Sequence, residues 1–331
     1  MSRIAKAAGR AAFTGGALIA IGGALYGAEL LAARRLRTRP DPDAAEVLRP
    51  LDLPGRAITS FDGTNLNVVE TGAGTPLVLV HGVTLSMRTW VRQLELLPAR
   101  GFRVIAVDQR GHGGSNVGAA AHGVDQLGDD LLHVLEDLDL RDAILVGHSM
   151  GGIAVQSFVI RHPEIARDRV RGIVLLSTLC TTPIGSRSTR LRGAVERATR
   201  RAPDTTPLWN SPNLGLLLAR VGFGRDPYPS EVELVRQMMR DCPSETRRDS
   251  TRALIGMDLA PGLASVAIPA LVVCGTADAI TPPFHARQLV GALAGARLEL
   301  VDGGGHMLML ERTERLNRLI EDFARDVGAH P

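Results

Sequence analysis

The strongest constraint on the fold is the alternation of short apolar runs with longer segments that have helical periodicity. In residues 124–140, for example, leucines recur at positions 127, 131, 135 and 138, a spacing that places them on one face of a helix. Near-continuous apolar runs are typical of parallel strands that are buried on both faces. We therefore predict an α/β protein with a mostly parallel sheet and helices on both faces. The runs that we assign to strands are 66–70, 76–81, 103–108, 143–148, 170–178, 269–276 and 296–302.

One interval interrupts this alternation. About 90 residues separate the run that ends at Thr178 from the run that begins at Pro269, with no strand-like run between them. Segments 230–242 and 247–259 have helical patterns, and a structureless loop of this length is uncommon in a compact domain. We therefore predict an α/β core that is formed by two separate parts of the chain, with a helical cap inserted between them. The core is assigned to residues 57–179 and 266–331, and the cap to 180–265.

The N-terminal region has a composition of its own. Residues 11–28 are uncharged and mostly apolar, and the run extends to Ala33 if Glu29 is tolerated, which is long enough for a bilayer-spanning helix. We predict that residues 1–36 form a hydrophobic helix that anchors the protein to a membrane. A cleaved signal peptide, for which no A-x-A site is present, and a helix lying on the membrane surface are the alternatives. Residues 37–56 hold four prolines and are predicted to be a linker.

The charge distribution separates the N-terminus from the rest of the chain. Residues 1–39 contain seven Lys or Arg and one Glu, a net charge of +6, while the whole chain carries +3, so that the remaining residues carry −3. The body thus lacks the basic excess of a nucleic-acid-binding protein, and we expect no nucleic-acid partner. Counted by the positive-inside rule, Arg49 and Arg56 favour a cytoplasmic catalytic domain.

Three cysteines, at positions 180, 242 and 274, are widely spaced and form no CxxC pattern. This spacing supports neither a disulfide framework nor a zinc site, and we expect no metal and no cofactor.

A candidate nucleophile follows the apolar run 143–148. Residues Gly147-His148-Ser149-Met150-Gly151 fit the pattern GxSxG, and a helical pattern begins immediately after them. A strand, a sharp turn and a helix are the context that a nucleophile elbow requires. A serine hydroxyl needs a base to take its proton and a carboxylate to orient that base. We predict that Ser149 is the nucleophile.

The candidate acid is Asp278, which stands just beyond the apolar run 269–276, at a strand's carboxyl end, where the active sites of α/β proteins gather. Asp302 and Asp258 are the competitors. Asp302 precedes the candidate base by only four residues, and Asp258 lies in the predicted cap. We prefer Asp278 and keep Asp302 as the alternative.

Three histidines follow Asp278 in the chain. His330 is next to the terminus, and His285 lies in a predicted helix after two prolines. His306 follows the last predicted strand in a loop of consecutive glycines, which lets the backbone bend over the strand ends. We predict that His306 is the general base.

The tetrahedral intermediate of acyl transfer needs two N–H donors. We assign them to Met150, directly after the nucleophile, and to Val83, in the loop after the run 76–81. His81 is expected to be a hydrogen-bonding residue of that loop, and residues 108–115 (DQRGHGGS) are expected to pack near the site.

These motifs occur in a familiar order. HG (81–82), DQRGHGGS (108–115), GHSMGG (147–152), GTAD (275–278) and GGGHMLMLE (303–311) together resemble the α/β-hydrolase superfamily over residues 57–326. The chain is similar in particular to its lid-bearing group, which contains carboxylesterases, monoacylglycerol-type lipases, cofactor-free haloperoxidases and carbon–carbon bond hydrolases. The resemblance implies an eight-stranded sheet, the triad Ser149, Asp278 and His306, an oxyanion hole at Val83 and Met150, and a cap after strand six.

Two differences from other branches of this superfamily narrow the range of activities that we expect. Serine at position 149, where epoxide hydrolases and haloalkane dehalogenases have aspartate, argues against both, and the absence of an HGGG run argues against the hormone-sensitive-lipase group. We expect a serine hydrolase that cleaves small hydrophobic or lipid-like carboxylic esters through an acyl-enzyme. A carbon–carbon bond hydrolase or perhydrolase with the same triad is one alternative, and a non-catalytic ligand-binding or membrane-scaffold protein is another.

Overall fold

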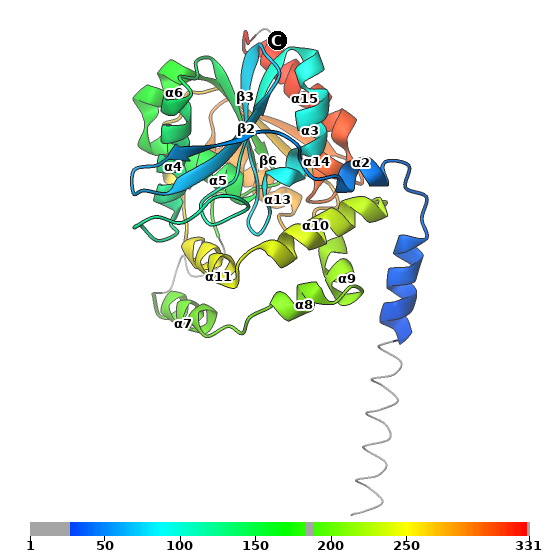
Figure 1. The fold of residues 1–331 in the computed structure, drawn as a ribbon. Coiled ribbons are helices and arrows are strands. Elements are labelled where there is room, and N and C mark those ends of the chain that lie inside the picture. Colours follow the sequence, from blue (N-terminus) through cyan, green and yellow to red (C-terminus); the bar gives the residue numbers. More distant parts are fainter. Residues whose placement is uncertain (1–26, 183–188, 330–331) are drawn as a thin grey trace, which may run out of the picture.

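The fold is built on one eight-stranded sheet (Figure 1). The structure is a computed structural model and describes residues 27–182 and 189–329. The strands are β1 (Gly55–Thr59), β2 (Asn65–Thr71), β3 (Thr75–Val80), β4 (Phe102–Val107), β5 (Ala143–His148), β6 (Val170–Leu176), β7 (Ala270–Gly275) and β8 (Arg297–Val301), in the order β1-β2-β4-β3-β5-β6-β7-β8. β1 pairs with β2, and β2 with β4, in antiparallel fashion, and all other neighbours are parallel.

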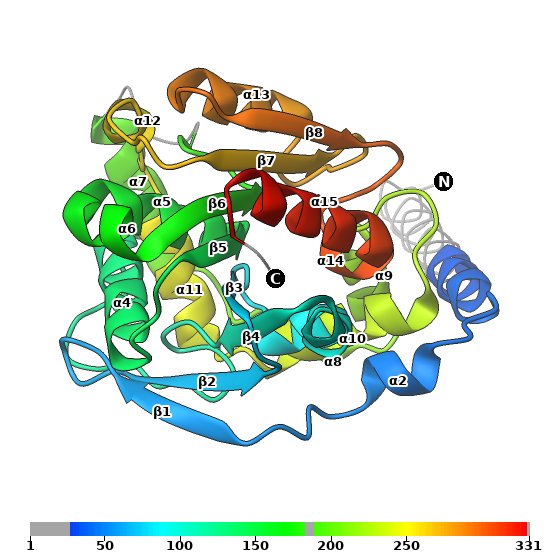
Figure 2. The same ribbon diagram turned by 90° about the horizontal axis from the view of Figure 1, so that it is seen from above.

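Side chains alternate between two apolar layers along the central strands. In β3, Leu77 and Leu79 belong to one buried cluster while Val78 and Val80 belong to the other. The first layer is covered by α3 (Val91–Leu96) and α15 (Thr313–Asp326), with η1 (Met87–Trp90), η2 (Pro98–Arg100) and α14 (Leu308–Glu311) beside them. The second is covered by α4 (Val124–Asp137), α5 (Met150–Arg161), α6 (Pro163–Arg169) and α13 (Pro283–Ala292), on the opposite face (Figure 2). The sheet is therefore buried on both faces, as near-continuous apolar strands require.

The seven strands predicted from the sequence correspond to β2 through β8, while β1 was missed. The segment 37–56 that we predicted to be a linker instead contains α2 (Ala44–Leu48), which packs on α10, and the first two residues of β1. Only Ile58 of β1 is buried, because β1 is an edge strand, so that its sequence shows little of the alternation that reveals a strand.

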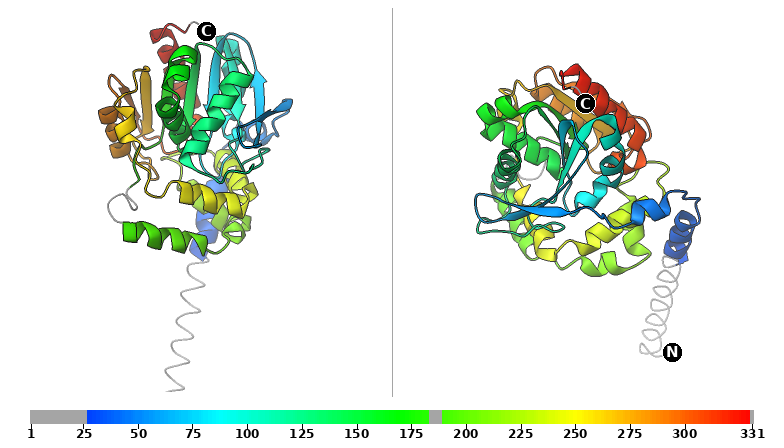
Figure 3. Two further views of the ribbon diagram at one scale, coloured as in Figure 1. Left: turned by 90° about the vertical axis from the view of Figure 1, so that its left-hand side faces the viewer. Right: turned by 45° about the horizontal axis from the view of Figure 1, so that its top comes forward.

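Helices fill the interval between β6 and β7. They are α7 (Thr189–Arg200), α8 (Thr206–Asn210), α9 (Leu214–Arg220), α10 (Pro229–Asp241), α11 (Ser244–Ala253) and α12 (Ala260–Leu263). The first five lie together below the carboxyl ends of the strands (Figures 1 and 3), whereas α12 packs against α5 and α13 of the core. The chain enters and leaves this group side by side, because Thr181 and Asp258 form an antiparallel bridge.

The N-terminal part of the described chain packs on the cap. Residues 27–37 are helical, with Ala33 and Leu36 buried, and the Arg37 guanidinium donates to Asn213 Oδ1 and to the Pro212 carbonyl, both at 2.7 Å. Most of the predicted membrane anchor falls on residues 1–26, outside the described residues. Among the helices of residues 27–182 and 189–329, none combines the length and hydropathy needed to cross a bilayer.

Candidate active site

Ser149 occupies a strained turn between β5 and α5. Its φ of +52° lies in the left-handed region, which costs free energy for a residue with a Cβ. The turn is tight: a Cβ at position 147 would lie 2.4 Å from the Gly151 carbonyl oxygen, and one at position 151 would lie 2.2 Å from the Val80 carbonyl oxygen. Glycine is therefore required on both sides of Ser149, and the geometry is that of a nucleophile elbow.

An acid–base pair lies in the loops that follow β7 and β8. His306 Nδ1 and Asp278 Oδ2 are 2.9 Å apart, and both side chains are buried. Asp278 also accepts hydrogen bonds from the Thr281 hydroxyl and from the backbone N–H groups of Ile280 and Thr281, at 2.8 to 2.9 Å. Burial alone would raise the pKa of Asp278, but the hydrogen bonds and charge of His306, together with those from Thr281, lower it to about 2. The carboxylate is thus ionised and fully partnered.

The competing acids and bases lie elsewhere. Asp302 is exposed and accepts a hydrogen bond from the Thr276 hydroxyl at 3.2 Å, and Asp258 accepts from the Ala260 N–H at the base of the cap. His285 is in α13, and His330 is outside the described residues. Of the three candidate acids, all of which lie in the described part of the chain, Asp278 is the one that is hydrogen-bonded to His306.

His148 joins the nucleophile turn to the histidine loop. Its ring lies 4.6 Å from the ring of His306, measured between centroids, and its Nε2 lies 3.0 Å from the His306 carbonyl oxygen. Burial holds the pKa of His148 well below its usual range, so that the ring is neutral and its Nε2–H is the donor. Because His148 precedes Ser149 directly, this contact joins the turn that carries the candidate nucleophile to the loop that carries the candidate base.

The two predicted oxyanion donors flank the same turn. Met150 is the first residue of α5, and the N–H groups in a helix's first turn have no acceptor inside the helix. Val83 follows Gly82, whose Cβ, if present, would lie 3.1 Å from Ser149 Cβ, so that the loop after β3 passes directly beside the serine. Both backbone segments are therefore near the place where an oxyanion would form.

The loop after β4 packs against the loop that holds Val83. His81 Nε2 accepts the N–H of Gln109 at 3.0 Å, and Asp108 accepts the N–H groups of Met87 and Gly114 at 2.7 and 2.9 Å. Residues 108–115 thus pack against the segment that holds Val83, near the site, as expected from the sequence.

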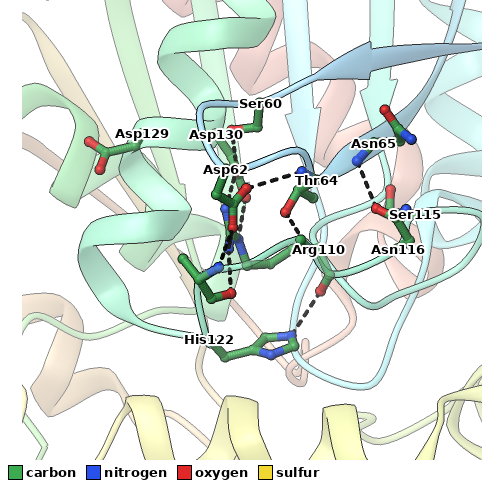
Figure 4. A network of polar contacts seen from close by, with 12 residues as sticks. Ser60, Asp62, Thr64, Asn65, Arg110, Ser115, Asn116, His122, Asp129 and Asp130 are labelled. Atoms are coloured by element: carbon green, nitrogen blue, oxygen red, sulfur yellow. Dashed lines mark hydrogen bonds and ion pairs between the residues drawn. The ribbon is translucent and has the colours of Figure 1, made fainter.

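A buried network of ion pairs and hydrogen bonds holds the loop after β4 in place through Arg110 (Figure 4). The Arg110 side chain is fully buried and binds Asp130 through two nitrogens at 2.6 and 2.7 Å and Asp62 at 3.1 Å. Asp130 also accepts from the Ser60 hydroxyl, and the Arg110 carbonyl binds His122 Nε2 at 3.0 Å. Such a network ties the β1–β2 turn, α4 and the loop 110–122 into one rigid support.

Comparison with known proteins assigns the family. A family model described as alpha/beta hydrolase fold matches residues 75–313. The chain belongs to the alpha/beta hydrolase family.

This hydrolase resembles several proteins over nearly their full length. It is 29% identical to the AB hydrolase superfamily protein YisY of Bacillus subtilis, over 82% of this chain and 99% of that protein. It is 30% identical to the non-heme chloroperoxidase CPO-A1 of Kitasatospora aureofaciens, over 80% of this chain and 98% of that protein. A thermophilic esterase from Thermogutta terrifontis superposes with a TM-score of 0.69 at 27% identity, over 84% of the hydrolase and all of that chain.

Sequence reasoning missed three supporting residues of the hydrolase, namely Thr281, His148 and Glu311. Thr281 had a local signal, because an aspartate often captures the N–H groups two and three residues later in a turn. His148 had none, since its partner His306 comes from a distant loop. The contacts of Glu311 with Gly305 and Met307 are local, but its contact with Gly224 of the cap had no signal in the sequence.

Proposed function

We propose that the hydrolase cleaves carboxylic esters through an acyl-enzyme on Ser149, with His306 as general base and Asp278 as the carboxylate that orients it. The observation that carries the proposal is the 2.9 Å contact between Asp278 and His306 Nδ1, in a loop that His148 joins to the strained turn at Ser149. Asp278 accepts a hydrogen bond from the Nδ1–H of His306, which keeps the proton of the neutral ring on Nδ1 and leaves Nε2 able to act as the base.

The proposed steps use these atoms in turn. His306 Nε2 takes the proton of Ser149 as its Oγ attacks the ester carbonyl, and the N–H groups of Val83 and Met150 stabilise the oxyanion. The same proton then passes to the leaving alcohol. Water, activated by His306 Nε2, attacks the acyl group and releases the acid, which restores the serine.

A fluorophosphonate probe tests the nucleophile. Wild-type protein should be labelled at Ser149, and Ser149→Ala should lose labelling and about 10⁴- to 10⁶-fold of its ester turnover. Ser265→Ala is the matched control, because Ser265 is exposed and precedes β7 at the opposite end of the strands. Turnover of Ser149→Ala within tenfold of wild type would contradict the proposal.

The substrate is proposed to be hydrophobic. Ile280 follows Asp278 by two residues and is 48% exposed, and Val221, which precedes Gly222 of the cap, is 57% exposed. A Cβ at position 222 would lie 3.7 Å from Ile280 Cδ1, so that the cap segment that carries Val221 passes beside Ile280, two residues from the candidate acid. Exposed apolar groups that gather at a site favour an apolar ligand.

An ester series graded by acyl length tests this preference. We expect kcat/KM to rise with chain length, and Ile280→Ser to reduce it more for long-chain esters than for acetate. Leu300→Ser changes an exposed leucine on β8 and should leave the series unaltered. A flat series in the wild type would argue for a small or polar substrate instead.

Perhydrolysis is the second candidate, favoured by the 30% identity to a protein named as a non-heme chloroperoxidase. In that reaction hydrogen peroxide replaces water as the acyl acceptor and yields a peroxy acid. Peroxy-acid formation from acetate and hydrogen peroxide, absent in Ser149→Ala, would support it.

A further inference from the structure

The cap touches the histidine loop through backbone hydrogen bonds. The His306 N–H donates to the Gly222 carbonyl oxygen at 2.8 Å, and the Arg225 N–H donates to the Gly303 carbonyl oxygen at 3.2 Å. Residues 222–225 connect α9 to α10 and therefore belong to the cap, whereas residues 303–307 carry the candidate base. The two loops are thus joined across the boundary between cap and core.

Glu311 binds both loops at once. Its Oε1 accepts the N–H groups of Gly305 and Met307, which flank His306, at 2.8 and 3.2 Å. Its Oε2 accepts the N–H of Gly224, in the cap, at 2.8 Å. A single carboxylate, charge-assisted at both oxygens, therefore holds the histidine loop and the cap loop in one geometry.

The two loops approach so closely that side chains are excluded between them. A Cβ at position 224 would lie 2.1 Å from the Gly303 carbonyl oxygen, and a Cβ at position 305 would lie 2.2 Å from the Gly224 nitrogen. This close contact, like the hydrogen bonds to Glu311, lies outside the reacting atoms of the proposed mechanism.

We infer that Glu311 and the cap loop 222–225 are positioning elements for His306, so that the seating of the cap sets the alignment of the general base. The inference rests on the proposed function, because it assigns His306 that role. A displacement of about 1 Å in a catalytic group can cost about 100-fold in rate. A cap that shifts at residues 222–225 moves the acceptor of the His306 N–H, and the imidazole moves with its backbone.

The test compares Glu311→Gln with the matched control Glu314→Gln, whose carboxylate lies on the surface against Arg100. Glutamine keeps the shape of Glu311 but presents an amide N–H₂ to one of the two sets of N–H donors. Rates are expressed per active site, titrated in the full-length protein with a fluorophosphonate. We expect Glu311→Gln to lower kcat per site by about 10- to 100-fold with KM within about twofold, and Glu314→Gln to leave both unchanged.

A residue that only stabilises the fold would lower the titrated fraction and leave kcat per site unchanged, and that result would overturn the inference. Gly224→Ala disturbs the same contact from the cap and should also lower kcat per site. If both act through one contact, the double variant should lose much less than the product of the two single effects. Multiplying effects would show that Glu311 and the cap act separately, which would also overturn the inference. A wild type that the probe fails to label at Ser149 would instead contradict the proposed function.

Discussion

In this hydrolase, residues of the candidate active site adopt states that are unfavourable in free energy, namely a strained backbone and a buried charge. Ser149 is held at a positive φ by glycines that leave no room for a side chain, and Asp278 is buried yet ionised because four hydrogen bonds converge on it. Strain and buried charge of this kind persist only where the surrounding structure compensates for them.

The choice between Asp278 and Asp302 is decided at this scale. We expect Asp278→Asn to lower ester turnover by about 10⁴-fold, because an amide cannot stabilise the imidazolium or hold the same tautomer. Asp302→Asn should have little effect, since that side chain is exposed and accepts a hydrogen bond from the Thr276 hydroxyl rather than from His306. Steady-state kinetics of both variants provides the measurement, and equal losses would reassign the acid to Asp302.

At the scale of elements, the entry into α10 contains a carboxyl group in an unfavourable setting. Glu231 accepts the N–H of Tyr228 at 3.0 Å in the first turn of the helix, and burial raises the pKa of Glu231 to about 7. A folded-state pKa above the unfolded value means that the native state binds more protons between these two values. The stability of the native state therefore falls as the pH rises from about 4.5 to about 7.

Replacing the carboxyl group of Glu231 should make the unfolding free energy less dependent on pH. The wild type should lose up to about 3 kcal/mol of unfolding free energy between pH 5 and pH 8 through Glu231, and Glu231→Gln should not show this loss. The glutamine side-chain oxygen can still accept the Tyr228 N–H. Urea denaturation at several pH values measures the difference. Glu245→Gln, at an exposed first-turn position of α11, is the control and should track the wild type. An unchanged slope in Glu231→Gln would show that the group is ionised throughout this range.

At the scale of the whole molecule, the N-terminal region has two separable parts. Residues 27–37 contact the cap through Arg37 and bury Leu36 in the apolar cluster that core and cap share, whereas the apolar run that we predict to be an anchor lies almost entirely before residue 27. Chains that begin at residue 27 and at residue 40 should therefore differ.

We expect the chain that begins at residue 27 to need no detergent, to keep the wild-type Tm and to hydrolyse a small soluble ester at the wild-type rate. The chain that begins at residue 40 also exposes the surface that Leu36 covers, which should cost about 1–2 kcal/mol and lower the Tm by ~2–6 °C. Thermal unfolding and turnover of the two chains measure this.

Fractionation of cells tests the anchor itself. Full-length protein should sediment with membranes and the shorter chains should not, so that full-length protein in the supernatant would contradict the anchor. Protease added to intact cells tests the side of the catalytic domain, and digestion from outside would contradict the cytoplasmic placement.

The sequence by itself determined the order of the elements and the identity of Ser149 as the elbow residue. Both depend on local patterns: apolar runs reveal buried strands, and glycines around a serine reveal a sharp turn. The edge strand β1 was not predicted, because only Ile58 is buried in it and its sequence therefore shows almost no apolar pattern.

Only the tertiary structure decided which carboxylate reaches His306 and what holds the histidine loop. Asp278 and Asp302 both stand at strand ends and differ little in sequence context, so their choice depended on how the loops after β7 and β8 fold toward each other. The hydrogen bond from the Gly224 N–H to Glu311 joins residues 87 positions apart and exists only once the cap is seated on the core. Contacts of this kind leave no periodic signal in a sequence, because they are set by the packing of elements rather than by the pattern within one.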